Sequence, residues 1–335
     1  MRRRHLTELL AVAACAVVLA ATAACGGDGD ARAGQPTAVR LGFSAWPGWF
    51  PWQVAQEKGL FQENGVTVEL TYFDSYTDSL QALSTGNLDA NSQTLNDTLS
   101  SASGGARQTI VLVNDNSTGN DQIIAAPGIN GVADLRGKKV AVEQGTVDHY
   151  LLLLALEKAG LTERDITLTP LLTDAAAAAF VAGQVDAVGA FAPFTTTALG
   201  RSGSRAIATS RDFPGAIPDH LAFDSEFVAD HPDEVQKVVQ TWFDTLKWIA
   251  ANPAEAVTIM ARRGGVSEAD YQTYNAGTTI FTREENLAAF TPGSGPSHLN
   301  HQADRIAEFL VKTELVPAKP SLDGLLEPKF VQAVT

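Results

Sequence analysis

Residues 39–72, VRLGFSAWPGWFPWQVAQEKGLFQENGVTVELTY, are the stretch of sequence that decides the fold. Two short apolar runs, at residues 39–43 and 66–72, predict β-strands. The residues between them, 52–61, predict a helix that Gly59 closes. A strand, a helix and a second strand in succession are typical of α/β architecture.

The same alternation continues along the chain. Residues 76–85 predict a helix that has Ser75 as its N-cap. Further strands are expected at residues 110–113, 122–126, 139–142, 166–170, 187–191 and 221–223. Further helices are expected at residues 146–159, 174–182, 232–251, 253–262, 284–290 and 303–313, and a helical turn at 134–137.

Connections near Ala125 and near Asp219 join a middle unit, of the length of a small domain, to the rest of the chain. We therefore predict two lobes. Residues 38–126 and 219–335 would form lobe I with the C-terminal helices, and residues 127–218 would form lobe II. The chain would cross between the lobes twice, at a hinge with a cleft beside it.

The N-terminus has the pattern of an export signal. Arg2, Arg3 and Arg4 precede an apolar run at residues 9–24, and Cys25 follows the small residues Ala23 and Ala24. This order predicts a signal peptide at residues 1–24, a lipid on Cys25, a polar tether at residues 25–37, and anchoring to the outer face of the cell membrane. Thr22 departs from the usual lipoprotein pattern, so an ordinary signal peptide with an incidental cysteine stays open.

Composition excludes several kinds of site. Both cysteines, Cys15 and Cys25, lie in the leader, which excludes cysteine nucleophiles and thiolate metal sites from the rest of the chain. The net charge of −14 disfavours nucleic acid as a partner. Six histidines are scattered, and His298 with His301 is their only close pair, so we expect no metal and no cofactor.

Five short blocks carry a resemblance to a known family: residues 55–61 AQEKGLF, 82–89 ALSTGNLD, 134–142 DLRGKKVAV, 181–187 VAGQVDA and 227–232 FVADHP. Together they make the chain resemble the nitrate/sulfonate/taurine-type solute-binding proteins of ABC importers, from about residue 39 to residue 315. The resemblance implies a two-lobed type II periplasmic-binding-protein fold. It also implies that the protein captures a small solute and delivers it to permease and ATPase subunits; we expect a monomer.

In such folds ligands meet the carboxyl ends of strands and the N-termini of helices. The candidate ligand-binding residues in these loops are Ser44, Trp46, Trp49, Phe50, Thr94, Asn96, Asp97, Asp115, Asp121, Glu143, Thr146, His149, Phe191 and Pro193. Trp52, Tyr76 and Asp74 lie in or beside the same loops. Asp121 falls where the resemblance places the acid of taurine-type members.

These loops contain no Lys or Arg but several acids and aromatic residues. A buried ammonium or guanidinium needs a carboxylate and benefits from an aromatic face. The sequence therefore favours a cationic or zwitterionic nitrogen compound, taurine-like or guanidine-like. Packing or capping roles stay open for Trp49, Trp52, Asp74, Asp97, Asp115 and His149.

Three other functions stay open. An anionic solute such as an alkanesulfonate or nitrate could bind through backbone N–H groups alone. An enzyme of the same fold, resembling the thiamine-pyrimidine synthases, would need a cysteine-rich loop that the chain after residue 25 lacks. A binding module that feeds a sensor kinase is the third.

Overall fold

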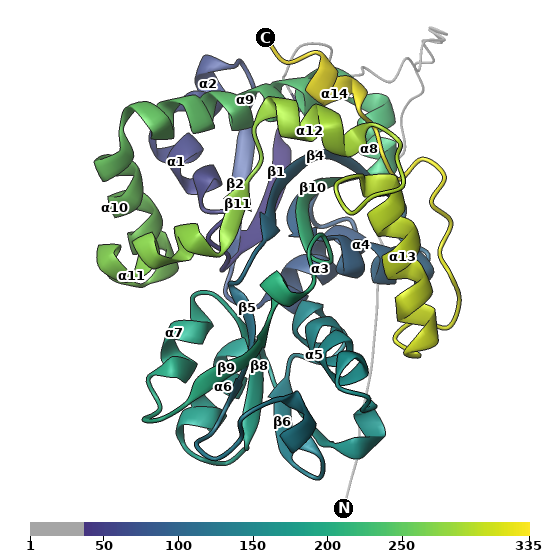
Figure 1. The fold of residues 1–335 in the computed structure, drawn as a ribbon. Coiled ribbons are helices and arrows are strands. Elements are labelled where there is room, and N and C mark those ends of the chain that lie inside the picture. Colours follow the sequence, from purple (N-terminus) through teal and green to yellow (C-terminus); the bar gives the residue numbers. More distant parts are fainter. Residues whose placement is uncertain (1–36) are drawn as a thin grey trace, which may run out of the picture. The chain divides into compact units, whose positions relative to one another are not determined.

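The computed structural model describes residues 37–335. The predicted signal peptide, Cys25 and all but the last residue of the tether lie outside the described residues. Residues 37–335 form one compact unit built on two β-sheets, which Figure 1 shows one above the other. None of the helices described is both long enough and apolar enough to cross a membrane.

The first sheet, sheet A, has six strands in the order β11-β4-β10-β3-β1-β2. β1 pairs in parallel with β2 and β3, and β10 pairs antiparallel with β3 and β4. Its strands are β1 (Val39–Ser44), β2 (Val68–Phe73), β3 (Ala90–Thr94), β4 (Gln108–Ser117), β10 (Pro218–Asp224) and β11 (Thr278–Ile280). The carboxyl ends of β1 and β3 therefore face the same way, which brings the loops after them together.

The second sheet, sheet B, has five strands in the order β7-β6-β8-β5-β9. They are β5 (Asp121–Ala125), β6 (Lys139–Val142), β7 (Thr167–Pro170), β8 (Ala187–Phe191) and β9 (Arg205–Thr209). The sequence placed residues up to 126 in the first lobe, but β5 pairs with β8 and β9 of sheet B. The first crossing thus lies at residues 118–120, earlier than the sequence predicted.

Helices cover both sheets. Those with the sheet A half are α1 (Pro51–Glu57), α2 (Leu60–Glu63), α3 (Tyr76–Ser84), α4 (Leu95–Ser103), α8 (Ser225–Asp230), α9 (Pro232–Ala251), α10 (Pro253–Gly264), α11 (Glu268–Thr273), α12 (Arg283–Phe290), α13 (Leu299–Lys312) and α14 (Lys329–Gln332). Those with the sheet B half are α5 (Val147–Lys158), α6 (Thr173–Val181) and α7 (Phe194–Leu199). Ser75 is the N-cap of α3, as predicted, and its Oγ accepts a hydrogen bond from the backbone N–H of Asp78 at 3.2 Å.

Local chemistry explains how the helix predicted at residues 52–61 differs from the structure. Gly59 adopts a left-handed conformation, with φ of 72°, which ends α1 and starts α2. α1 is held in place by Trp52, whose ring lies 4.7 Å from that of Trp242 on α9, centroid to centroid. This packing anchors α1 and therefore fixes the loop of residues 45–50 that precedes it.

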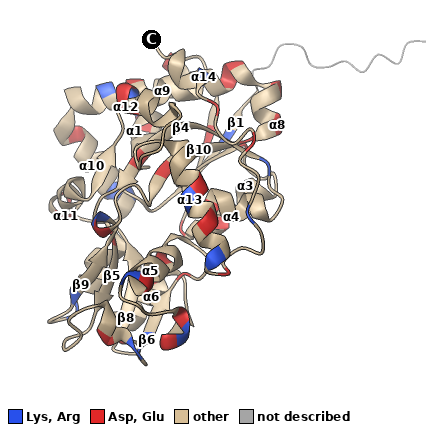
Figure 2. Cartoon of the chain, turned by 45° about the vertical axis from the view of Figure 1, so that its right-hand side comes forward, with Lys and Arg blue, Asp and Glu red and all other residues tan. Residues whose placement is uncertain are grey.

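Two connections join the sheets: residues 118–120 between β4 and β5, and residues 210–217 between β9 and β10. The side-chain amide of Asn120 donates to the backbone oxygen of Tyr274 and to Oγ1 of Thr278, both at 2.7 Å. The first connection is therefore fastened to the sheet A half just before β5 begins. Figure 2 shows the basic residues dispersed over several elements, among acidic ones.

Candidate ligand-binding site

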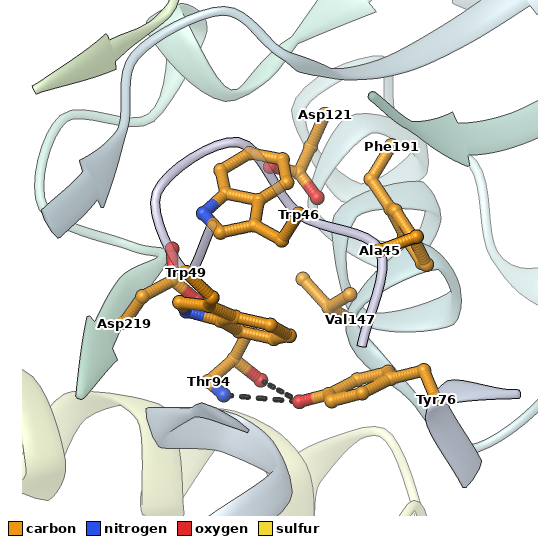
Figure 3. Close-up of a pocket in the computed structure, with 9 residues that line it drawn as sticks. All are labelled: Ala45, Trp46, Trp49, Tyr76, Thr94, Asp121, Val147, Phe191 and Asp219. Carbon is orange, nitrogen blue, oxygen red and sulfur yellow. Dashed lines mark hydrogen bonds between the residues drawn. The ribbon is translucent and has the colours of Figure 1, made fainter. Parts of the chain in front are cut away.

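A small cavity of about 10 Å³ lies where the loops after β1 and β3 meet elements of the sheet B half. It is lined by Ala45, Trp46, Trp49, Tyr76, Thr94, Asp121, Val147, Phe191 and Asp219 (Figure 3). Six of these residues come from the sheet A half, and Asp121, Val147 and Phe191 come from the sheet B half. The cavity is thus the interlobe cleft that the fold predicts.

Four aromatic rings surround this cavity. Trp46 lies 6.3 Å from Trp49, Trp49 lies 5.5 Å from Tyr76, Tyr76 lies 6.1 Å from Phe191, and Phe191 lies 6.5 Å from Trp46, measured between ring centroids. Each ring therefore has two of the others as neighbours, which makes a closed aromatic cage. Such a cage attracts a cation through the negative faces of the rings.

Three buried carboxyl groups lie at this cavity. Asp121 and Asp219 line it directly, and Asp115 lies next to it, where its Oδ1 accepts a hydrogen bond from Nε1 of Trp46 at 2.9 Å. Burial raises the pKa of Asp115 and of Asp121 to about 7. Burial, followed by the negative charges of Asp115 and Asp121, also raises the pKa of Asp219 well above its usual range.

The oxygens of these carboxyl groups are poorly satisfied. Both oxygens of Asp219, and Oδ2 of Asp115 and of Asp121, are buried without a hydrogen-bond partner. No Lys or Arg is among the residues that line the cavity, as the sequence predicted for these loops. Buried polar groups normally have a partner, so these oxygens suit a group that donates hydrogen bonds or carries positive charge.

A second cavity, also of about 10 Å³, shares Ala45, Tyr76 and Phe191 with the first. Glu143, which follows β6, lines it and is 4% exposed. Its Oε1 accepts hydrogen bonds from the backbone N–H and the hydroxyl of Thr77 on α3, and its Oε2 accepts from the same two groups of Thr173 on α6. One carboxylate therefore joins the two halves of the molecule.

Asp97 is buried but does not line either of these cavities. Its Oδ2 accepts hydrogen bonds from Oγ1 of Thr94 at 2.7 Å and from the hydroxyl of Tyr76 at 2.9 Å. Burial raises its pKa to about 7. Its contacts hold Tyr76 and Thr94 against each other, so it orients the cage rather than facing the cavity.

The predicted residues fall into two groups. Trp46, Trp49, Thr94, Asp121 and Phe191 line the first cavity, and Ser44 and Glu143 line the second, with Asp115 beneath Trp46. Phe50, Asn96, Asp97, Thr146, His149 and Pro193 line neither of the two. Phe50 instead packs on Tyr271, and Nε2 of His149 contacts Glu163 at 2.7 Å, which turns the ring away from the cleft.

The structure adds Asp219, Val147 and Thr173, which were not predicted as ligand-binding residues. Asp219 was identified only as the place where the chain crosses back to the first sheet. Its neighbours in sequence are Pro218 and His220, and nothing in that context marks an acid that pairs with Asp115 across two antiparallel strands. The pairing of β10 with β4 is what brings the two together.

This two-sheet α/β fold matches that of periplasmic solute-binding proteins. The NMT1-like family matches residues 32–263, and the chain belongs to that family. A binding protein of Brucella abortus is 31% identical over 277 residues, covering 81% of this chain and 85% of that protein.

A second relative and one solved structure are also similar to this chain. The taurine-binding periplasmic protein of Escherichia coli is 27% identical over 277 residues, covering 80% of this chain and 85% of that protein. The crystal structure of the alkanesulfonate-binding protein SsuA of Xanthomonas axonopodis pv. citri, bound to MOPS, has a TM-score of 0.75 at 22% identity. It covers 88% of this chain and all of that one, and at that identity it bears on the fold alone.

Proposed function

We propose that the chain is the exported solute-binding subunit of an ABC importer, and that it captures a small solute whose positively charged nitrogen lies in the aromatic cage. A cationic, guanidine-like compound and a zwitterionic, taurine-like compound both meet this description. The names of the relatives support the class of solute-binding subunit.

One observation carries the proposal about charge. Asp121 and Asp219 present unpartnered carboxyl oxygens to a cavity that four aromatic rings enclose and no basic side chain lines. A bound cation would offset the burial of these acids, and each charge-assisted hydrogen bond would contribute about 1.5–3 kcal/mol. An anion at the same place would add a further negative charge.

The leader completes the proposal. Residues 1–24 would direct export, and a lipid on Cys25 would hold the protein at the outer face of the membrane, next to the permease and ATPase subunits that receive the solute. The two halves would close around the solute about the connections at residues 118–120 and 210–217.

A thermal-shift screen of the purified full chain tests the ligand class. Guanidinium, taurine, alkanesulfonates, nitrate and bicarbonate would be compared. A solute present at 100 times its Kd adds about 2.7 kcal/mol of stability. We expect a nitrogen cation or zwitterion to raise the Tm. A rise with nitrate or bicarbonate alone would contradict the proposal.

Asp121→Asn tests the site. We expect the Kd for the solute found in the screen to increase at least about tenfold, which is about 1.4 kcal/mol. Asp174→Asn is the matched control, because Asp174 is an exposed acid at the rim of the second cavity. Unchanged affinity in Asp121→Asn would remove Asp121 from the site.

A further inference from the structure

Glu143 places a negative charge between the N-termini of two helices from opposite halves of the molecule. Thr77 is the second residue of α3 and Thr173 is the first residue of α6, and each helix has nine residues. The backbone N–H of each threonine lies 3.2 Å from an oxygen of Glu143, and Oγ1 of Thr173 lies 2.7 Å from Oε2. Four donors therefore converge on one carboxylate.

Four convergent donors at two helix N-termini are the environment in which proteins bind an oxyanion. A second observation points to a ligand position here. Ser44 lines the same cavity, is 1% exposed, and its Oγ is buried with no hydrogen-bond partner. The Ser44 hydroxyl at this cavity is a fifth group that would suit an oxyanion. The oxyanion position, however, already holds the carboxylate of Glu143.

A neighbouring acid shares one of these donors. Oγ1 of Thr173 lies 2.7 Å from Oε2 of Glu143 and also 2.7 Å from Oδ2 of Asp148. A hydroxyl donates only one proton, so this one donates to one of the two carboxyl groups at a time. Burial raises the pKa of Asp148 well above its usual range.

We infer that Glu143 determines the specificity of the site. Its carboxylate fills the oxyanion position, so the cleft admits a solute that has a positive end. A solute that also carries a sulfonate or carboxylate at its other end is excluded. This inference rests on the proposed function, in which the positive end lies between Asp121 and Asp219. Among the two kinds of solute proposed above, it selects the simple cation over the zwitterion.

Three probes of matched shape test this inference. Ethylammonium carries only the positive group, ethanesulfonate carries only the sulfonate, and taurine carries both on the same two-carbon chain. The Kd of each would be measured by titration calorimetry for the full chain and for Glu143→Ala. We expect the full chain to bind ethylammonium at least about tenfold more tightly than taurine, and Glu143→Ala to reverse or abolish this preference.

Asp174→Ala is the matched control, since it removes an exposed acid from the rim of the same cavity and leaves the oxyanion position filled. It should leave the ratio of the two Kd values within about twofold, well under the 1.4 kcal/mol of a tenfold change. Glu143→Gln keeps the volume of the side chain and guards against a variant that does not fold. It should lower the ratio by at least about threefold.

Rescue provides a measurement that does not depend on the solute. Removal of Glu143 leaves four donors without their acceptor, so Glu143→Ala should have a lower Tm than the full chain, and millimolar acetate or methanesulfonate should restore part of it. The same anions should leave the Tm of the full chain unchanged. No rescue, or equal stabilisation of both proteins, would overturn the inference.

The two proposals fail in different ways. If taurine binds the full chain as tightly as ethylammonium does, while Asp121→Asn still weakens both, only the role of Glu143 is wrong. If the full chain binds ethanesulfonate but no nitrogen cation, the proposed function is wrong, and the inference falls with it.

Discussion

The indole N–H of Trp46 donates to Oδ1 of Asp115 at 2.9 Å, while Oδ2 of the same carboxyl group is buried with no partner. The ring of Trp46 is therefore part of the aromatic cage, and its nitrogen contacts the acidic cluster of Asp115, Asp121 and Asp219. A side chain that serves both features ties the position of the rings to the position of the acids.

Asp219→Asn should stabilise the empty protein and impair binding. Both carboxyl oxygens of Asp219 are buried without partners, and Asp115 and Asp121 are close enough to raise its pKa. At pH 8 the unfolded chain ionises this acid, whereas burial and the neighbouring acids oppose its ionisation in the folded protein, so replacing it with a neutral amide should increase the free energy of unfolding in urea by roughly 1–3 kcal/mol. The Kd for ethylammonium should increase at least about tenfold. A destabilised variant that binds normally would show that Asp219 has a structural role only.

The stability of the empty protein should fall as the pH rises from about 4 to above 7. Asp97, Asp115 and Asp121 each have an ordinary pKa of 3.8, which burial raises to about 7 in the folded state. The folded protein therefore binds more protons than the unfolded chain between these values, and the stability they contribute is lost as the pH passes the folded pKa. The free energy of unfolding, measured in urea, should be lower at pH 8 than at pH 5.5.

Affinity for a nitrogen cation should change in the opposite direction, because the ionised acids are the ones that attract it. Ethylammonium should therefore bind more tightly at pH 8 than at pH 5.5, with release of protons detectable in buffers of different ionisation enthalpy. In Asp121→Asn both pH dependences should be shallower. Affinity that is independent of pH would exclude these acids as ligands.

Gly48→Ala should disrupt the acidic cluster without touching a charged residue. A Cβ atom at this position would lie 1.9 Å from Oδ2 and 2.2 Å from Cγ of Asp115, so the carboxyl group would have to move. We expect a loss of about 1–3 kcal/mol in the free energy of unfolding and weaker binding of ethylammonium. Gly131→Ala is the control, since its φ is −162° and an added Cβ meets no atom within 4 Å. Equal behaviour of the two variants would contradict the close approach.

Cys25→Ala should release the exported protein from the membrane. If Cys25 carries the lipid that the leader predicts, the variant should appear in the soluble extracytoplasmic fraction, while the unaltered chain stays with the membranes. Fractionation followed by mass spectrometry of the N-terminus checks this. A variant that remains in the membrane fraction would point to another mode of attachment, and an unmodified Cys25 would exclude the lipid.

The fold was largely predictable because its main signal is local. Apolar runs mark strands such as β1 and β6 directly, and the glycine stops mark the ends of α3 and α5. α4 was missed, because residues 94–98 are mostly polar although they are buried. Asn91 and Gln93 bond to each other and to their neighbours, and this polar network replaces the apolar contacts that sequence patterns detect.

The sequence indicated the chemistry of the site, but it did not indicate which residues line it. The loops lack Lys and Arg and contain tryptophans and acids, and Trp46, Trp49 and Asp121 from them line the cavity. Phe50 and His149 were included because they belong to the same loops, whereas the direction of a side chain depends on packing. Asp219 depends on the register of β10 against β4, which is a long-range property.

Three buried acids lie beside the two connections between the sheets: Asp115 precedes the first connection, Asp121 follows it directly, and Asp219 follows the second. A guest seated among them would therefore act as a counter-ion on the axis about which the halves are joined. Without it, like charges would push the connecting segments apart; with it, they would be drawn together. Recognition and closure would then be one electrostatic event, and a molecule of the wrong charge would leave the protein open even if it fitted the cage.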